Sequence, residues 1–464
     1  MTERTGQRSE RSPSPPRPDG AAASESSGPA QPSSAQPPSA GTPSGTPSGT
    51  PAGRPAGTSP GAPAAEAAGV SGAEPSGATA RPDAAGGTAP DGGSPGAEGR
   101  TAAPCSGGST RPGPTDVLLR PPPPALSPPR PVGARRIWPR SFAHRLTSPL
   151  PGVRALARLA REGAMRPVAT ALAEEIPQLP FAPGPLPEPG PDGLSVTWAG
   201  HASWVVRIGG LTVLTDPVWS RKILGTPARI TPVGVAWQDL PPIDAVVISH
   251  NHYDHLDAPT LRRLPRSTPL FVPAGLGAWC RKRGFTTVTE LDWWEGAELP
   301  ARRDGSAATA GGAGRARVRF DFVPAHHWSK RTLTDTCRSL WGGWVLTDPQ
   351  GQRVYFAGDT GYGHWFAEIG RRFAGVDLAL LPIGAYDPRW MLRPVHTDPE
   401  EAVRACQDVG ARRMAPMHWS TFLLSGEPPL EPLTRVRDAW AEAGRPREDL
   451  WDLPVGASRV LEAA

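Results

Sequence analysis

Four side chains of the kind that binds metal ions lie within six positions, directly after an apolar run. The run DAVVIS predicts a buried strand, and His250 and His252 follow it two positions apart, so their side chains can point the same way. Asp254 and His255 come next, at the start of a predicted helix. Imidazole nitrogen and carboxylate oxygen are the ligands that zinc prefers when no thiolate is offered. This spacing indicates a metal site where a strand meets a loop.

Such a site needs ligands from other parts of the chain. Histidine or aspartate follows an apolar run in the stretches VPAHHW, FAGDTG, RPVHTD and APMHWS. Because each stretch lies where a predicted strand meets a loop, we expect these side chains to converge on one edge of the sheets. The candidates are His326, His327, Asp359, His396 and His418.

Short apolar strands dominate the chain from Leu194 onward, first in hairpins and then in alternation with helices. This order predicts a layered α/β domain. Asp398, Pro399 and Glu401 have the spacing of a helix N-terminus. Gly/Ala-rich residues 302–315 predict a loop inside a hairpin. Strands are predicted at 194–200, 203–210, 211–217, 244–250, 317–325, 342–348, 353–359, 378–384 and 412–419, and helices at 259–265, 275–284, 364–373, 398–410 and 433–444.

Residues 1–132 differ in composition from the rest. Most of the excess of 61 prolines and 53 glycines lies there, with few large apolar side chains to offset the ordering entropy, so we predict a disordered tail. Residues 133–191 form a linker with a short amphipathic helix from Val153. We favour a helix packed on the domain, with a basic helix on anionic lipid as the alternative. Residues 192–464 are the predicted folded domain.

The net charge is +5, but the basic residues form no long run, so we predict no nucleic-acid partner. Four scattered cysteines without a C-x-x-C pair indicate reduced thiols. The chain has no stretch of eighteen apolar residues, so we predict no membrane span. The N-terminus also lacks the apolar core of a signal peptide. We therefore expect a cytoplasmic protein, with peripheral contact at the inner membrane face left open.

The H-x-H-x-D-H pattern and the downstream positions resemble the metallo-β-lactamase fold superfamily, whose fold is an αββα sandwich with metals at one edge. Within it, the chain is similar to N-acylphosphatidylethanolamine-hydrolysing phospholipase D. The stretches that carry this similarity run from Thr197 to about Pro432, and Ser420 stands where the family pattern would have glycine. They are DLPPIDAVVISHNHYDHLD, TELDWWE, HWSKRTL, FAGDTGY, PIGAYDPRW, HTDPEEAV and HWSTF.

The resemblance implies two zinc ions that share one carboxylate. His250, His252 and His327 would hold the first, Asp254, His255 and His418 the second, and Asp359 would bridge both.

Neighbouring groups receive other roles. The resemblance selects His327 over His326, because it directly precedes the tryptophan of the HW motif. It places His396 near the metals without ligating them, where it could contact a phosphate oxygen; the N-terminus of the helix that follows could face the same anion. Asp216 is expected to orient a ligand imidazole. For His201 we leave open the same role or that of a buried histidine.

The function that the resemblance implies is zinc-dependent cleavage of N-acylphosphatidylethanolamine to N-acylethanolamine and phosphatidic acid. Two zinc ions about 3.5–4 Å apart would acidify a bridging water to hydroxide and stabilise an in-line displacement, so Asp254, Asp359 and His396 are expected to be catalytic. Alternatives are a lactonase or other small-ester hydrolase of the superfamily, and a zinc-containing scaffold at a membrane surface. The expected partner is a phospholipid or small phosphodiester substrate, and a homodimer remains open.

Overall fold

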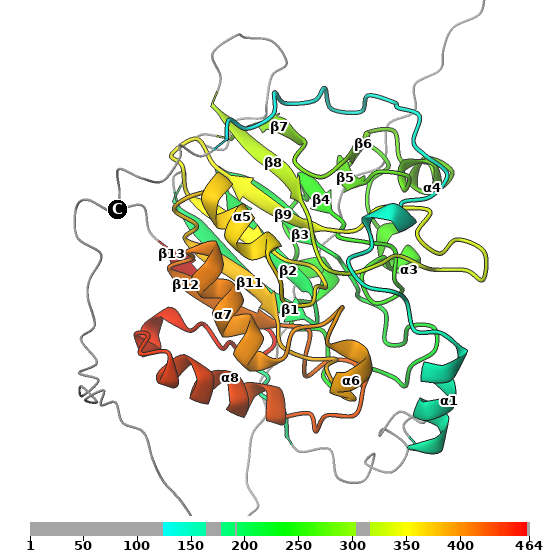
Figure 1. The fold of residues 1–464 in the computed structure, drawn as a ribbon. Coiled ribbons are helices and arrows are strands. Elements are labelled where there is room, and N and C mark those ends of the chain that lie inside the picture. The colour runs from blue at the N-terminus through cyan, green and yellow to red at the C-terminus, as the bar shows by residue number, and fades with distance from the viewer. Residues whose placement is uncertain (1–123, 164–177, 191–192, 303–315, 462–464) are drawn as a thin grey trace, which may run out of the picture. The chain divides into compact units, whose positions relative to one another are not determined.

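The computed structural model describes residues 124–163, 178–190, 193–302 and 316–461, and every element below lies in these ranges (Figure 1). Two β-sheets face each other, and helices cover their outer faces. This arrangement confirms the predicted α/β class and αββα layering. Among the described residues, no helix is long and apolar enough to cross a membrane.

The first sheet has the strand order β13-β1-β2-β3-β4-β5-β6. Its first strands pair as antiparallel hairpins, whereas β3 to β6 run parallel. The register places Val213 of β3 beside Ala245 of β4, so the metal-ligand motif begins at the carboxyl end of a central strand. The bounds are β1 Leu194–Gly200, β2 Ser203–Ile208, β3 Leu211–Thr215, β4 Ala245–Val247, β5 Leu270–Pro273, β6 Val288–Leu291 and β13 Ser458–Leu461.

The second sheet has the order β12-β11-β10-β9-β8-β7. Strands β7 to β10 are antiparallel, and β10, β11 and β12 are parallel. The loops after β10 and β12 therefore leave the sheet at the same edge. The bounds are β7 Gly296–Pro300, β8 Arg317–Val323, β9 Gly343–Thr347, β10 Arg353–Phe356, β11 Leu378–Pro382 and β12 Arg413–Met417.

Helices α5 and α7 cover the second sheet, whereas α3 and α4 pack on the first. Helix α7 begins as predicted, because the Asp398 side chain accepts a hydrogen bond from Glu401 N at 2.8 Å. It ends at Gly410, whose φ of 71° suits glycine. The helices are α1 Val153–Arg161, α3 Ala258–Leu261, α4 Gly277–Arg281, α5 Trp365–Arg372, α6 Arg389–Leu392, α7 Pro399–Val409 and α8 Glu431–Glu442, with 3₁₀ turns at Ala143–Arg145, Trp237–Asp239 and Arg447–Asp449.

The core between the two sheets is built from large aromatic side chains. Phe271 of β5 stacks on Phe320 of β8 with ring centroids 4.4 Å apart, and Trp344 of β9 lies against both strands. All three side chains are fully buried. Both faces of most strands are covered, so the sequence shows apolar runs rather than strict alternation.

The folded part begins earlier than predicted. Arg130 N donates a hydrogen bond to Gly296 O at 2.6 Å, and Arg319 Nη2 donates to Ser127 O at 2.6 Å. The predicted boundary at residue 132 is therefore wrong, because this proline-rich segment is held by polar contacts that apolar content does not reveal. The rest of the predicted tail, residues 1–123, and loop residues 303–315 lie outside the described residues.

Helix α1 packs through its polar side. Trp390 Nε1 of α6 donates a hydrogen bond to Glu162 Oε2 at 3.0 Å, and Arg158 lies 4.0 Å from the centre of the Trp390 ring. Val153 and Leu156 are exposed. The helix forms and contacts the domain as predicted, but it does so through polar side chains and not through the face of Val153 and Leu156.

Candidate metal centre

The predicted ligands gather at one edge of the two sheets, each on a loop that follows a strand. This edge lies where parallel strands of both sheets end, which is how distant parts of the sequence meet. His250 and His252 follow β4, Asp254 and His255 precede α3, His327 follows β8, Asp359 follows β10 and His418 follows β12.

A first group consists of His250, His252, His327 and Asp359, whose ligand atoms lie within 4.8 Å of one another. His252 Nδ1 is 2.8 Å from His250 Nε2 and 3.2 Å from His327 Nε2. Asp359 Oδ2 is 3.7 Å from Nε2 of both His250 and His327. The three imidazoles thus converge beside one carboxylate, in the combination assigned to the first zinc ion.

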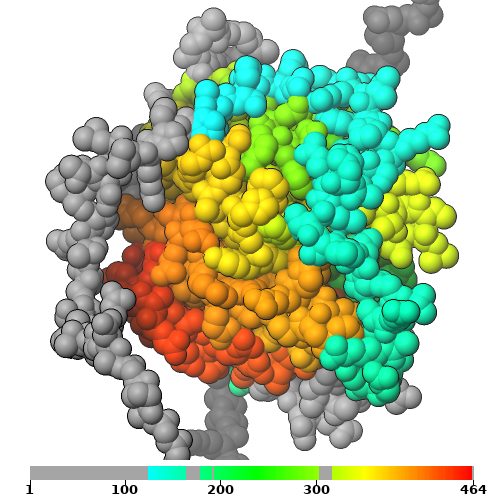
Figure 2. Space-filling model, viewed as in Figure 1, coloured from blue at the N-terminus to red at the C-terminus, as the bar shows by residue number. Residues whose placement is uncertain are grey.

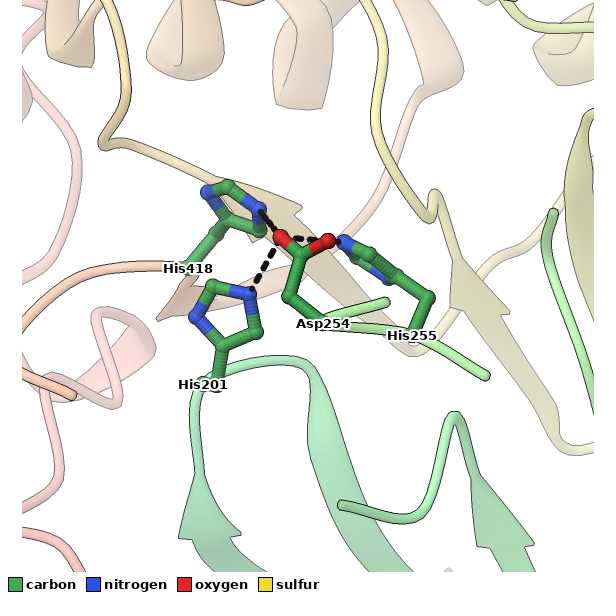
Figure 3. A group of neighbouring side chains, drawn as sticks. All are labelled: His201, Asp254, His255 and His418. Atoms are coloured by element: carbon green, nitrogen blue, oxygen red, sulfur yellow. Dashed lines mark hydrogen bonds and ion pairs between the residues drawn. The ribbon is translucent and has the colours of Figure 1, made fainter. Parts of the chain in front are cut away.

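A second group consists of Asp254, His255 and His418, joined by His201. Figure 3 shows the Asp254 carboxylate between the three imidazole rings. Asp254 Oδ2 is 3.1 Å from His201 Nε2 and 3.4 Å from Nε2 of both His255 and His418. The structure therefore also brings together the residues assigned to the second zinc ion.

Asp359 lies between the two groups. Its Oδ2 is 3.1 Å from His255 Nε2, its Oδ1 is 3.1 Å from His418 Nε2, and Oδ2 also faces the first group. Asp359 Oδ1, His255 Nε2 and His418 Nε2 are buried, yet none has a hydrogen-bond partner. Buried polar atoms that face one another without hydrogen bonds fit a shared cation, and nitrogen with carboxylate oxygen suits zinc.

Hydrogen bonds at Nδ1 fix the orientation of two ligand rings. Asp216 Oδ2 accepts a hydrogen bond from His255 Nδ1 at 2.7 Å, and Asp216 Oδ1 accepts one from Ser249 N at 2.7 Å. The Ser249 hydroxyl lies 2.9 Å from His250 Nδ1 and also donates to Asp216. With Nδ1 engaged, Nε2 of each ring faces the centre. Asp216 thus occupies the position expected of a residue that orients a ligand.

The two consecutive histidines after β8 face different surroundings. His327 Nδ1 donates to Val395 O at 3.0 Å, and its Nε2 faces the first group. His326 Nδ1 instead lies 2.9 Å from Thr147 Oγ1, and its ring packs against His364. The structure therefore places His327, and not His326, among the candidate ligands.

His201 and His396 border the centre. His201 lies in the turn between β1 and β2, and sequence reasoning left its role open; the signal was a histidine at a hairpin end on the ligand edge. Burial lowers the pKa of both His201, to about 3, and His396, to about 4. The His396 ring lies 5.2 Å from that of His327 and 5.6 Å from that of His418, and its Nδ1 is buried without a partner.

The three imidazoles of the first group are uncharged at neutral pH. Burial is the main cause that holds the pKa of His250 and His327 well below the ordinary value, and it lowers the pKa of His252 to about 4. Neutral imidazole is the form that binds a metal ion.

In the second group, the carboxylates reverse this effect. Burial alone would lower the pKa of His255 and His418, but Asp359 and Asp254 outweigh it. The pKa of His255 is well above its ordinary value, and that of His418 is about 9. Burial likewise opposes ionisation of both carboxyl groups, but the histidines hold their pKa well below the usual range.

This difference predicts that metal binding releases protons at one group only. His255 and His418 are protonated below their raised pKa and must lose about two protons at pH 7, whereas His250, His252 and His327 lose almost none. Affinity at the second group should therefore rise with pH from neutral through the pKa of His418, about 9. Calorimetric zinc titrations of metal-free protein at pH 7, in buffers of different ionisation enthalpy, measure this release. Equal release in both binding steps would refute it.

The backbone conformation at Ser420 suits glycine, the residue that the resemblance leads us to expect there. Its φ is 61°, in the left-handed region, and its hydroxyl is buried without a hydrogen-bond partner. We expect Ser420→Gly to stabilise the protein by about 1 kcal/mol, raising the unfolding temperature by about 2–4 °C in calorimetry. Ser339→Gly is the matched control, because the Ser339 hydroxyl is also buried and unpaired but its φ is not positive. A gain for Ser339→Gly, or none for Ser420→Gly, would contradict this account.

Comparisons with known proteins agree with this geometry. The family model described as "Beta-lactamase superfamily domain" matches residues 212–419. N-acyl-phosphatidylethanolamine-hydrolyzing phospholipase D 1 of Caenorhabditis elegans is 38% identical over 289 residues, which cover 59% of this chain and 76% of that protein. The mitochondrial enzyme of that name from Saccharomyces cerevisiae is 38% identical over 248 residues, 52% of this chain and 50% of the relative.

Among solved structures, the metallo hydrolase Igni18 of Ignicoccus hospitalis matches 59% of this chain and all of its own, at 24% identity and a TM-score of 0.41. The fold, the metal-ligand groups and the matched family model define a metal-dependent hydrolase of the β-lactamase superfamily. Within that superfamily, the chain belongs to the family of N-acyl-phosphatidylethanolamine-hydrolysing phospholipase D.

Proposed function

We propose that this protein is a dinuclear zinc phosphodiesterase that cleaves N-acylphosphatidylethanolamine to N-acylethanolamine and phosphatidic acid. The observation that carries the proposal is the position of Asp359 between the two groups. Its Oδ2 lies near His250 and His327 of the first group and near His255 of the second, and its Oδ1 faces His418. A single structural zinc site would need only four ligands in a closed set. The names of the nematode and yeast relatives support the substrate.

When bound, two zinc ions would supply a nucleophilic water at neutral pH and neutralise charge on the phosphoryl oxygens. The chain's own residues prepare this site. Asp359 is shared by both groups, and Asp254 faces three imidazoles of the second. Asp216 and Ser249 hold ligand rings in place, so the site needs little rearrangement during the reaction.

His396 is the group best placed to contact a phosphate oxygen. Its pKa of about 4 makes it neutral at pH 7, and a neutral imidazole donates one hydrogen bond. The prediction that the N-terminus of α7 faces the same anion as His396 is wrong. Asp398 caps that end and pairs with Arg389, while Glu401 in the first turn pairs with Arg389 and Arg393. An anion would meet carboxylates there, so its recognition rests on the His396 ring.

A small pocket with both polar and apolar walls borders His418. The pocket also touches Glu427, but that carboxylate already accepts hydrogen bonds from Ala385 N and Asp387 N. Its apolar walls include Ile230, Trp419, Phe422, Leu423 and Leu424.

The test offers zinc-loaded protein three substrates: synthetic N-acylphosphatidylethanolamine, bis(p-nitrophenyl) phosphate and an acyl lactone. Mass spectrometry in ¹⁸O-labelled water should detect N-acylethanolamine and phosphatidic acid. The label should appear in phosphatidic acid, because water adds to phosphorus as the bond from phosphorus to the ethanolamine oxygen breaks. Turnover of the lactone without either phosphodiester would favour the small-ester hydrolase and overturn this proposal.

A further inference from the structure

The most exposed large apolar side chains of the described residues lie in four segments, not scattered over the surface. Single exposed apolar residues are ordinary in folded proteins, but a group around one site marks an interaction surface. Two of these segments belong to the N-terminal part of the chain, and two are loops beside the metal centre. The exposed fractions are 96% for Ile137, 83% for Val153, 50% for Leu156, 69% for Leu224 and 94% for Leu333.

Each of these side chains has basic neighbours. The pattern is a basic pair or cluster within a few positions of the apolar residue, and the chain's three lysines include two of these neighbours. Such a mixture of apolar and cationic groups suits the boundary of an anionic bilayer. The basic residues are Arg135 and Arg140 near Ile137, Arg154 and Arg161 on the helix of Val153 and Leu156, Arg221 and Lys222 before Leu224, and Lys330 before Leu333. Arg136 instead pairs with Glu295, and Arg331 packs on Tyr253.

The two loops meet on the metal-ligand motif. Tyr253, between His252 and Asp254, donates its hydroxyl to Arg331 O at 2.9 Å, and the Arg331 guanidinium lies 4.0 Å from its ring centre. Tyr253 also packs against the cluster that contains Ile223. The loops that carry Leu224 and Leu333 are therefore held beside the metal centre.

The N-terminal segment completes this side of the domain. Phe142 N donates a hydrogen bond to Cys337 O at 2.7 Å, which ties the segment to the loop of Leu333. Further along, Thr147 contacts His326, next to the ligand His327. Helix α1 then reaches Trp390 of α6. Figure 2 shows this blue-green segment along one side of the domain, with the yellow-green loop beside it.

We propose that these four segments form a docking surface for an anionic lipid membrane, beside the metal centre. The apolar residues would enter the boundary between headgroups and acyl chains, while the basic side chains contact anionic headgroups. The tips are separate side chains on loops and one helix, which suits a fluid membrane better than a rigid protein partner. The inference rests on the proposed function in one respect: the substrate is a lipid drawn from that membrane.

Co-sedimentation of the full chain with vesicles tests the surface without turnover. The vesicles contain phosphatidylcholine alone or with about 30% phosphatidylglycerol, and no N-acylated lipid. We expect clear binding to the anionic vesicles and much weaker binding to the neutral ones. Lys330→Glu/Leu333→Asp should lower the affinity for anionic vesicles at least about tenfold. This change spares the contacts of Arg331 and Asp335 that shape the loop.

The matched control is Arg459→Glu/Val460→Asp, one basic and one exposed apolar residue on β13. That strand is the outer edge of its sheet, separated from β4 by β1, β2 and β3. The control should bind vesicles as the unchanged protein does. Arg221→Glu/Leu224→Asp provides a second variant on the docking surface. Hydrolysis of soluble bis(p-nitrophenyl) phosphate should be unchanged in all three variants, which shows that they fold.

The outcomes separate the two proposals. Absence of binding by the unchanged protein, or equal losses in docking variants and control, overturns the docking surface. If the docking variants lose vesicle binding but no variant or unchanged protein cleaves N-acylphosphatidylethanolamine, the surface stands and the proposed function fails. If both hold, the docking variants should cleave that lipid in vesicles at least about tenfold more slowly than the control.

Discussion

Replacing Asp359 with alanine should remove metal from both groups and lower kcat by about 10³-fold or more. Its Oδ2 lies near imidazoles of both groups, and its Oδ1 faces His418 of the second group. Burial opposes its ionisation, but His255 and His418 hold its pKa well below the usual range, so it is an anion at neutral pH. Loss of one electrostatic contact costs about 10²–10³ in kcat, and this residue serves two metal ions. Elemental analysis and hydrolysis of bis(p-nitrophenyl) phosphate measure both effects.

Asp348→Ala is the control, because Asp348 is also a buried aspartate of the second sheet but accepts hydrogen bonds in the turn after β9. It should keep the metal content of the unchanged protein. Asp359→Asn adds a stricter comparison, since it preserves the shape and removes the charge. Two bound metal ions with near-normal kcat in Asp359→Asn would show that the carboxylate does not join the groups.

His396→Ala should keep both metals and lose about 10²–10³ in kcat. The ring lies beside His327 and His418, and its Nδ1 has no partner inside the protein. Its ligand atom lies within 4.8 Å of those of Asp359 and His418, but the resemblance assigns it to neither zinc ion. A hydrogen bond that strengthens as charge builds on phosphate contributes to kcat by about this factor. The measurements are kcat, KM and zinc content of the purified variant.

His418→Ala is the comparison variant and should lose metal from the second group, because His418 Nε2 faces both Asp254 and Asp359. If His396→Ala loses as much zinc as His418→Ala, His396 is a ligand and the assignment is wrong. Unchanged kcat would make His396 a packing residue. Partial recovery in His396→Gln, whose amide can donate a hydrogen bond, would support the contact with phosphate.

Strands with long apolar runs could be predicted from the sequence, whereas several short ones could not. The run before His250 became β4, at a central position where both faces are buried. Strand β5 was missed because Pro269 and Pro273 flank its three apolar residues, a pattern typical of loops. It forms because β4 and β6 pair with it on either side. Strands β6, β7 and β13 were also missed, because each has at most two large apolar side chains.

The local spacing of the ligands could be predicted from the sequence, but their convergence on one centre could not. His250 and His252 follow a predictable strand, so their common direction follows from periodicity. His201 and His418 instead have φ of 56° and 64°, and a sequence gives little sign of such left-handed residues outside glycine. These conformations turn both rings toward Asp254. Similarly, periodicity found α1 but could not show which of its faces packs on α6.

A zinc titration of metal-free protein tests most directly whether two metal ions act together at Asp359. Hydrolysis of bis(p-nitrophenyl) phosphate is followed as zinc is added, and bound zinc is counted in the same samples. Activity should stay low through the first equivalent and reach its plateau at about two equivalents per chain, because both groups must be filled. A plateau at about one equivalent, with no further zinc bound, would contradict the dinuclear centre.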